Sequence, residues 1–161
     1  MNTRIRKARV PSADRRIAAP EGWDPVLRAE FETNQLNGCV GHVLVSETER
    51  VRVWSLRLRP GERIGFHRHV LDYFWTALST GRAVSHFGDG RIGESVYEPG
   101  LTRHMAFGPG DFMVHDLANV GDTELTFTTV EFLDSANPPL PVPEHVRRER
   151  QSFERNEPIR L

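Results

Sequence analysis

The feature that most constrains the fold is a rapid succession of short, strand-like segments separated by turn sequences. Turn signals such as Arg59-Pro60-Gly61-Glu62 and Asn119-Val120-Gly121-Asp122 stand between these segments. Short β-rich runs with a turn about every 8 to 12 residues are typical of an antiparallel sandwich or small barrel. The sequence therefore predicts an all-β fold with strands over Val40–Val45, Val51–Leu58, Tyr73–Leu78, Ala83–Phe87, His104–Phe107, Phe112–His115 and Leu125–Leu133.

The segments on either side of this β-rich region differ from it in composition. Residues 1–19 hold six basic residues and one acid, Asp14, without a sustained apolar period, so we expect a mobile or loosely docked arm. Residues 20–136 form the predicted barrel. Residues 137–161 begin with a proline-rich segment, which cannot continue a central strand, and end in a polar tail. A chain of 161 residues fits one such domain.

Two short helices are expected outside the strands. Asp24 and Pro25 form a helix start, with an N-cap followed by proline, and this helix is predicted to run through Glu30. A polar surface helix is predicted over 144–155 in the tail.

Composition excludes several classes of protein. The net charge of −1 argues against a nucleic-acid binder, which usually has a strong basic excess. No apolar run approaches the roughly 20 residues that span a membrane, and the N-terminus lacks the apolar region of a secretory signal, so we expect a cytoplasmic protein. The single cysteine, Cys39, rules out an internal disulfide and a cysteine-based zinc site.

Histidines carry the strongest chemical signal. His67 and His69 are two residues apart, so an extended segment places both imidazoles on one face, about 6.6 Å apart along the strand. Two ring nitrogens at that spacing can converge on one metal ion at about 2.1 Å each. A third ligand must come from a neighbouring strand, and His115 is the natural candidate.

The spacing of these residues resembles the motifs of the cupin superfamily. Gly61, His67, His69 and Gly81 match the first motif, G(X)5HXH(X)3–4E(X)6G, with Phe74 in the position of the glutamate. The second motif ends in H(X)3N, which His115 and Asn119 match, whereas its usual upstream P-x-G is absent. The resemblance covers about residues 40–133. It implies a single antiparallel, jelly-roll-like cupin barrel and a homodimer.

Loss of the glutamate implies a site of three neutral imidazoles with the full +2 charge of the ion and open coordination positions. The chain is similar to three-histidine dioxygenase cupins and, in overall motif shape, to small cupins assigned to β-alanine degradation. The resemblance favours one Fe(II) ion, with Zn, Mn, Ni or Cu as alternatives, and O2-dependent cleavage of a small chelating organic acid or ketone. The alternatives are a redox-neutral isomerase, lyase or hydrolase, and a non-catalytic small-molecule-binding cupin.

Strand parity around Phe74 predicts the surroundings of the metal. If Phe74 takes the glutamate position, its ring faces the metal, and Asp72 and Thr76 share that face; the other interpretation makes Phe74 plain core. Asp72 is predicted either to accept a hydrogen bond from a ligand imidazole or to replace the glutamate as fourth ligand. Met113 is assigned to the same pocket.

Other polar residues leave alternatives open. His104 either acts as a proton shuttle in the cavity or lies at the surface. Glu131 either faces outward or is the buried partner of an arginine. Arg57, Arg59, Arg82 and Arg103 could each anchor a carboxylate substrate. Because 20 of the 21 basic residues are arginine, however, any one arginine is weak evidence for an anion site.

Overall fold

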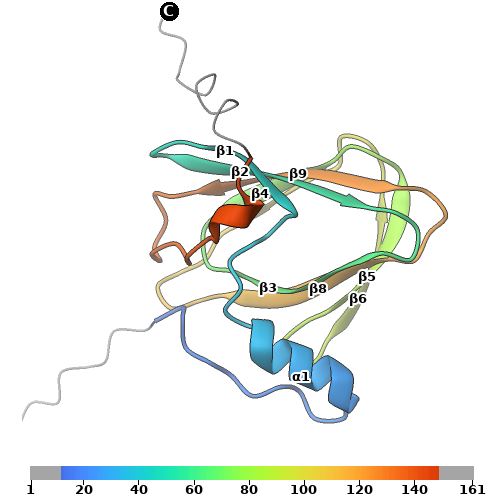
Figure 1. The fold of residues 1–161 in the computed structure, drawn as a ribbon, viewed down its shortest axis with the longest axis horizontal. Helices are drawn as coiled ribbons and strands as arrows, with labels where there is room; N and C mark the ends of the chain where they lie inside the picture. Colours follow the sequence, from blue (N-terminus) through green and yellow to red (C-terminus); the bar gives the residue numbers. More distant parts are fainter. Residues whose placement is uncertain (1–11, 149–161) are drawn as a thin grey trace, which may run out of the picture.

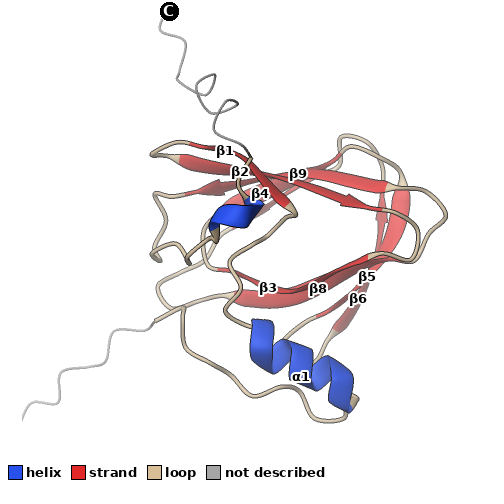
Figure 2. Cartoon of the chain, viewed as in Figure 1, coloured by secondary structure: helices blue, strands red, loops and turns tan. Residues whose placement is uncertain are grey.

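The computed structural model describes residues 12–148, which fold into two facing antiparallel sheets with one helix against them (Figures 1 and 2). The five-stranded sheet has the order β1-β2-β9-β4-β7, and the four-stranded sheet has the order β3-β8-β5-β6. The strands are β1 Val43–Glu47, β2 Val51–Leu58, β3 Arg63–His69, β4 Tyr73–Ala77, β5 Gly81–His86, β6 Ile92–Tyr97, β7 Thr102–Met105, β8 Met113–Asn119 and β9 Leu125–Phe132.

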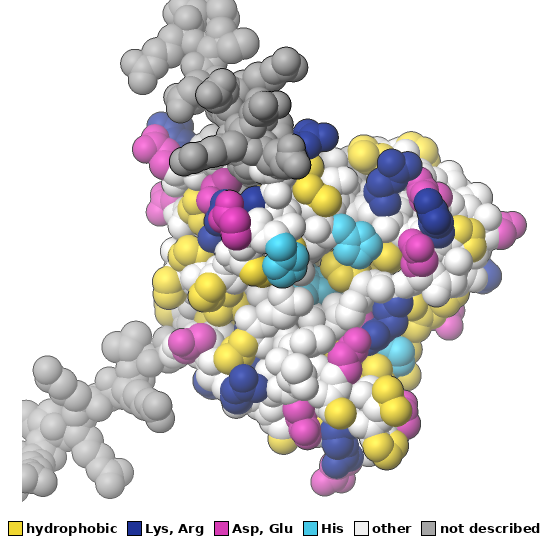
Figure 3. Space-filling model, viewed as in Figure 1, with side chains coloured by type: hydrophobic (Ala, Val, Ile, Leu, Met, Phe, Trp, Pro, Cys, Tyr) yellow, Lys and Arg dark blue, Asp and Glu magenta, His cyan; other side chains and the backbone are white. Residues whose placement is uncertain are grey.

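The predicted all-β class is confirmed. Apart from the directly paired strands β1–β2 and β5–β6, successive strands alternate between the two sheets in a jelly-roll-like arrangement. Among the described residues the two ladders stay separate, so the sheets face each other without closing into one hydrogen-bonded barrel. None of the helices in residues 12–148 has the length and apolar character needed to span a bilayer. Acidic and basic side chains are interspersed over the face drawn in Figure 3, as expected for a net charge of −1.

Sequence periodicity located most strands, and Val51–Leu58 matches β2 at both ends. Strand β6 was not predicted, because its sequence IGESVY is largely exposed at the edge of a sheet and gives no apolar alternation. Helix α1 begins where expected, at Pro25, with the Asp24 carboxylate accepting from two backbone N–H groups. It runs to Asn34 rather than Glu30, because Phe31 is buried against the four-stranded sheet.

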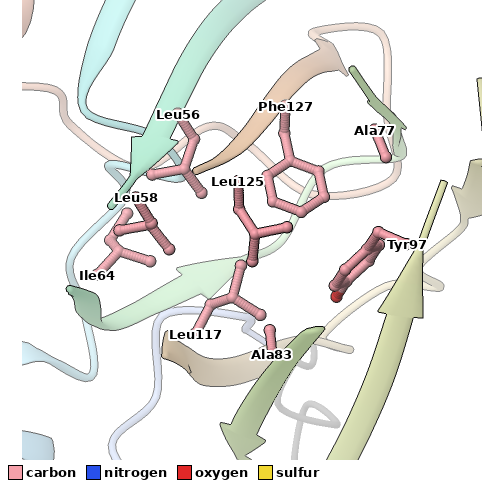
Figure 4. Close-up of a cluster of buried hydrophobic side chains, with 9 residues drawn as sticks. All are labelled: Leu56, Leu58, Ile64, Ala77, Ala83, Tyr97, Leu117, Leu125 and Phe127. Atoms are coloured by element: carbon pink, nitrogen blue, oxygen red, sulfur yellow. The ribbon is translucent and has the colours of Figure 1, made fainter. Parts of the chain in front are cut away.

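The main apolar core fills the space between the sheets (Figure 4). Both sheets contribute inward-facing side chains. On β4, Ala77 is buried in this cluster, and side chains alternate along a strand, so every second residue counted from Ala77 also faces the interior. The same parity turns Tyr73 and Trp75 inward. The cluster consists of Leu56, Leu58, Ile64, Ala77, Ala83, Tyr97, Leu117, Leu125 and Phe127.

The described part of the N-terminal arm is docked rather than loose. The guanidinium of Arg68 is buried and donates to the carbonyls of Ala13 and Arg15 at 2.6 and 2.8 Å. The side chain of Gln35 bonds both the N–H and the C=O of Ile17. These bonds hold residues 13–17 on the protein because a buried guanidinium without acceptors would be costly. Residues 1–11 lie outside the described residues.

The proline-rich segment also packs on the domain. The side-chain amide of Asn137 is buried, donates to the carbonyls of Val70 and Gly108, and accepts from Gly110 N–H. The predicted tail helix is seen only as a short 3₁₀ turn, η1 Glu144–Val146, and the rest of 144–155 lies mostly outside the described residues. The boundaries of the three predicted parts stay a prediction.

A buried carboxylate lies on the inner face of the five-stranded sheet. Glu131 is 3% exposed and accepts a hydrogen bond from Trp54 Nε1 at 2.8 Å. Arg52 faces it in the strand register but donates instead to Glu47 and to the carbonyl of Leu140. Glu131 is therefore buried, with Trp54 rather than an arginine as its hydrogen-bond partner. Burial raises the pKa of its carboxyl to about 7.

This raised pKa predicts a pH-dependent cost to stability. Because the folded state binds the Glu131 proton more tightly than the unfolded state, stability is lost as pH rises from 4.5 to about 7 and stays lost above that range. Glu131→Gln keeps an acceptor for Trp54 but cannot ionise. We expect its free energy of unfolding, relative to the native protein, to rise between pH 5 and pH 8 by up to about 3 kcal/mol.

Urea denaturation of both proteins between pH 5 and pH 8 measures this difference. Glu124→Gln, which removes an exposed partner of Arg57, is the control and should give a small, nearly constant difference. A pH-independent difference for Glu131→Gln would contradict an ionised Glu131 as the source of the cost.

Candidate metal centre

The three predicted histidines meet on the inner face of the four-stranded sheet. Strands β3 and β8 pair so that His67 lies directly opposite His115, with ring centroids 4.5 Å apart. His69 lies 5.1 Å from each of the other two rings. One nitrogen of each ring can be chosen so that all three atoms lie within 4.8 Å of one another. Neighbouring strands thus bring together residues from two distant parts of the sequence.

A β-bulge in β3 gives the histidines this orientation. Ile64 faces Leu117 across the strand pair, but Gly65 and Phe66 on β3 then correspond to Asp116 alone on β8 before His67 meets His115. The extra residue reverses which side chains point inward. Ile64 thus lies in the core cluster while His67 and His69, of opposite parity, also face the interior.

Glycine at the bulge lets a side chain of helix α1 approach closely. A Cβ on Gly65 would lie 2.9 Å from Glu30 Oε1, too close for a real contact. Glu30 is held there by the guanidinium of Arg63, which donates to both of its oxygens at 2.8 and 2.5 Å and to Asp116 at 2.7 Å. Helix α1 thereby packs onto the bulge at Gly65, which is not one of the motif glycines.

Burial keeps the imidazoles neutral. Desolvation lowers the pKa of His67 to about 4 and holds those of His69 and His115 well below the usual value. His67 Nδ1 donates to the carbonyl of Gly65 at 2.9 Å, which leaves the lone pair of Nε2 available to a ligand. Neutral imidazoles are the protonation state that metal coordination needs.

The spacing of the ring nitrogens fits a shared cation. His69 Nε2 lies 3.1 Å from His115 Nε2. Two nitrogens bound to one ion at about 2.1 Å, at angles between octahedral and tetrahedral, would be about 3.0 to 3.4 Å apart. The Nδ1 atoms of the same two rings are buried without a hydrogen-bond partner among the described residues. Such a polar cluster is unfavourable by itself, so the donor set fits a divalent metal ion.

Aromatic rings enclose the histidines in a cavity of about 230 Å³. Tyr73 stacks on His69 with centroids 4.2 Å apart, and Phe87 stacks on His115 at 5.5 Å. A neighbouring groove shares Phe87, Met105 and Met113 with the cavity. Met113 therefore lines the pocket as predicted. The remaining aromatic and hydroxyl side chains of the lining are Trp75, Tyr97, Phe127, Ser85, Ser95 and Thr129.

The orientation predicted for Phe74 and Thr76 is wrong. Phe74 packs against His104 and Phe132 on the outer face of the five-stranded sheet, and Thr76 bonds Thr102 there at 2.8 Å. Parity in β4 is fixed by the inward Tyr73, Trp75 and Ala77 instead. The motif allows three or four residues before the glutamate position. The three-residue spacing selects Tyr73 and could have predicted that Tyr73, rather than Phe74, lines the cavity.

Asp72 and His104 also lie away from the histidines. The Asp72 carboxylate accepts from the backbone N–H of Phe107 at 2.8 Å, and it does not belong to the histidine cluster. It therefore fixes a loop rather than an imidazole and does not replace the missing ligand. His104 is exposed on the outer face beside Phe74, so it does not face the cavity as the proton-shuttle interpretation requires.

The sequence matches no known family model and no curated protein. Among solved structures, a cupin-domain protein from Bordetella pertussis Tohama I is similar at 30% identity, with 53% of this chain and 84% of that chain covered and a TM-score of 0.47. A double-stranded β-helix protein from Klebsiella pneumoniae has 28% identity, 52% and 64% coverage and a TM-score of 0.42.

A third similar structure is described as a sugar phosphate isomerase of the cupin superfamily from Silicibacter pomeroyi. It has 26% identity, a TM-score of 0.39 and coverage of 52% of this chain, which spans about half (51%) of that protein. The sequence likeness to the Bordetella protein extends over most of its length, and the histidine spacing is that of the cupin motifs. The chain is thus similar to solved cupin-domain proteins, and its described residues bring three histidines together.

Proposed function

We propose that the protein is a mononuclear, metal-dependent cupin enzyme, a non-haem Fe(II) dioxygenase that acts on a small chelating organic acid or ketone. The observation that carries this proposal is the convergence of three neutral imidazoles beside a cavity lined by aromatic side chains. A divalent ion bound there would supply Lewis acidity and open coordination positions for substrate oxygens and O2. Iron is favoured by analogy with three-histidine cupins, since imidazole also suits Zn, Ni and Cu.

The residues around the histidines bind, orient and exclude water. The hydrogen bond from His67 Nδ1 to Gly65 holds that ring in one tautomer. Tyr73 and Phe87 restrict the other two rings by stacking. Trp75 and Phe127 form an apolar wall, which supports a substrate with an apolar portion and keeps bulk water from the reacting atoms.

A redox-neutral reaction is the alternative, and it would need a group that moves a proton near neutral pH. The cavity places phenols next to the histidines, and burial raises the pKa of Tyr73 and of Tyr97 above their usual value. Both are weak acids at neutral pH, and His104 lies on the other face of the sheet. Glu131, whose carboxyl pKa burial raises to about 7, accepts from Trp54 and is not among the lining residues. This distribution of the described residues supports the oxygenase over the isomerase, lyase or hydrolase.

A homodimer and a cytoplasmic location, both expected from the sequence, remain part of the proposal. The non-catalytic small-molecule-binding cupin shares the cavity and the metal with the proposed enzyme. Turnover is therefore what separates those two proposals.

Metal analysis tests the site directly. Protein purified without chelator is expected to contain about one divalent ion per chain by plasma mass spectrometry, with three histidines and open positions as its coordination. His115→Gln should weaken the affinity for Fe(II) or Zn(II) at least about tenfold, because it removes a direct ligand. His145→Gln, an exposed histidine outside the cluster, is the matched control. Equal loss in both variants, or no binding by the native protein, would contradict the site.

Oxygen dependence tests the reaction. With Fe(II) bound, a small chelating ketone such as acetylacetone, or a small keto acid such as pyruvate, should be consumed together with O2, and the Zn(II) form should be inactive. An oxygen electrode and product analysis measure this. Conversion that proceeds equally in air and under nitrogen would eliminate the dioxygenase and favour the redox-neutral alternative.

A further inference from the structure

Arg103 is the one arginine or lysine in the cavity lining, within the part of the chain that the structure describes. It lies on edge strand β7 opposite Trp75, whose side chain lines the cavity with it. The lining histidines, His67 and His115, lie on the facing four-stranded sheet. The cavity therefore has the histidines at one end and the exposed edge strand of Arg103 at another side.

Arg103 also differs from other arginines of the domain in its contacts. Arg63 is held between two carboxylates, and Arg57 and Arg91 each pair with one acidic side chain. Among residues 12–148, Arg103 forms neither a salt bridge nor a side-chain hydrogen bond. Its guanidinium is thus free to receive a ligand, and a planar carboxylate is the group that matches its donors in a bidentate way.

The cavity lining between Arg103 and the histidines determines which uncharged part of a ligand can bind there. Trp75, Tyr97 and Phe127 form its aromatic part, and Ser85 and Ser95 add hydroxyls. The volume of about 230 Å³ is smaller than the roughly 300 to 1,000 Å³ of pockets for drug-sized ligands. The space suits a small molecule with an apolar or aromatic body and a charged end.

We propose that Arg103 is the substrate-anchoring residue of the cavity and that the substrate is a small carboxylate, with its negative charge at Arg103 and its apolar body along the aromatic wall. This inference rests on the proposed function for the reaction at the end of the substrate that lies near the histidines. It narrows the substrate class from acid or ketone to an organic acid. A ketone without a charge would leave the guanidinium without its partner, and a site built for one charge discriminates against the uncharged analogue.

Binding of matched acids and amides tests this assignment. The probes are benzoate against benzamide and pentanoate against pentanamide, titrated calorimetrically into the full-length protein in metal-free and Zn(II)-loaded forms. We expect each carboxylate to bind at least about tenfold more tightly than its amide in both forms, because the preference comes from Arg103. Arg103→Met should abolish the preference, and Arg103→Lys should keep part of it because lysine retains charge but not the fork.

Arg82→Met is the matched control. Arg82 is exposed on the outer face of β5, away from the cavity lining, so its loss changes the net charge equally and should leave the preference intact. Thermal unfolding of each variant checks that Arg103→Met folds, and Arg103→Lys gives a second reading at the same position.

The outcomes separate this inference from the proposed function. Equal binding of acid and amide, a preference that survives Arg103→Met, or no binding of either carboxylate up to about 10 mM would overturn it. A preference confined to the Zn(II) form would also overturn it, since the metal would then be the anchor. If the protein binds no metal, the proposed function fails while the metal-free titrations still decide the role of Arg103.

Discussion

One extra residue in strand β3 is the constraint on which the rest of the site depends. Strict alternation from the core residue Ile64 would turn Phe66 and Arg68 into the cavity and the two histidines toward helix α1. The bulge reverses this order, so that Phe66 packs with Phe31 under the helix and His67 faces His115. Helix α1 secures the bulge through the approach of Glu30 to Gly65, and Arg63 ties that carboxylate to the sheet. The only long helix of residues 12–148 thus contributes to the chemistry from outside the sandwich.

Burial then determines the electrostatics of the centre. Desolvation lowers the pKa of all three neighbouring imidazoles and keeps them neutral. Glu131, a buried acid with a raised pKa, lies on the facing sheet and accepts a hydrogen bond from Trp54. Beside the histidines, the ring of Tyr73 stacks on His69. A cation bound to the three rings would therefore keep most of its charge for a substrate.

The sequence predicted the three histidines because their signal is spacing, which survives in any extended pair of strands. It could not predict the phase of β4, because YFWTA has large apolar side chains on both faces. Phe74 is half-buried outside, against Phe132, and so looks like core in the sequence. Period alone says that alternate residues share a face, and only the neighbouring strands say which face is inside. The bulge in β3 could not be predicted either, because one inserted residue leaves the apolar pattern of the sequence almost unchanged.

The arginines of this chain can be assigned different roles only from their contacts in the structure, not from their residue type. In a chain whose basic residues are nearly all arginine, each guanidinium has the same chemistry and the sequence gives no ranking among them. The structure separates them by what satisfies their donors. Arg68 is buried and donates to backbone carbonyls that hold the arm, and Arg63 lies between the carboxylates that secure the bulge. Arg103 has a cavity in front of its donors instead of an acceptor. A guanidinium left without a partner beside an aromatic cavity contributes little to folding, so its effect is on what enters the cavity.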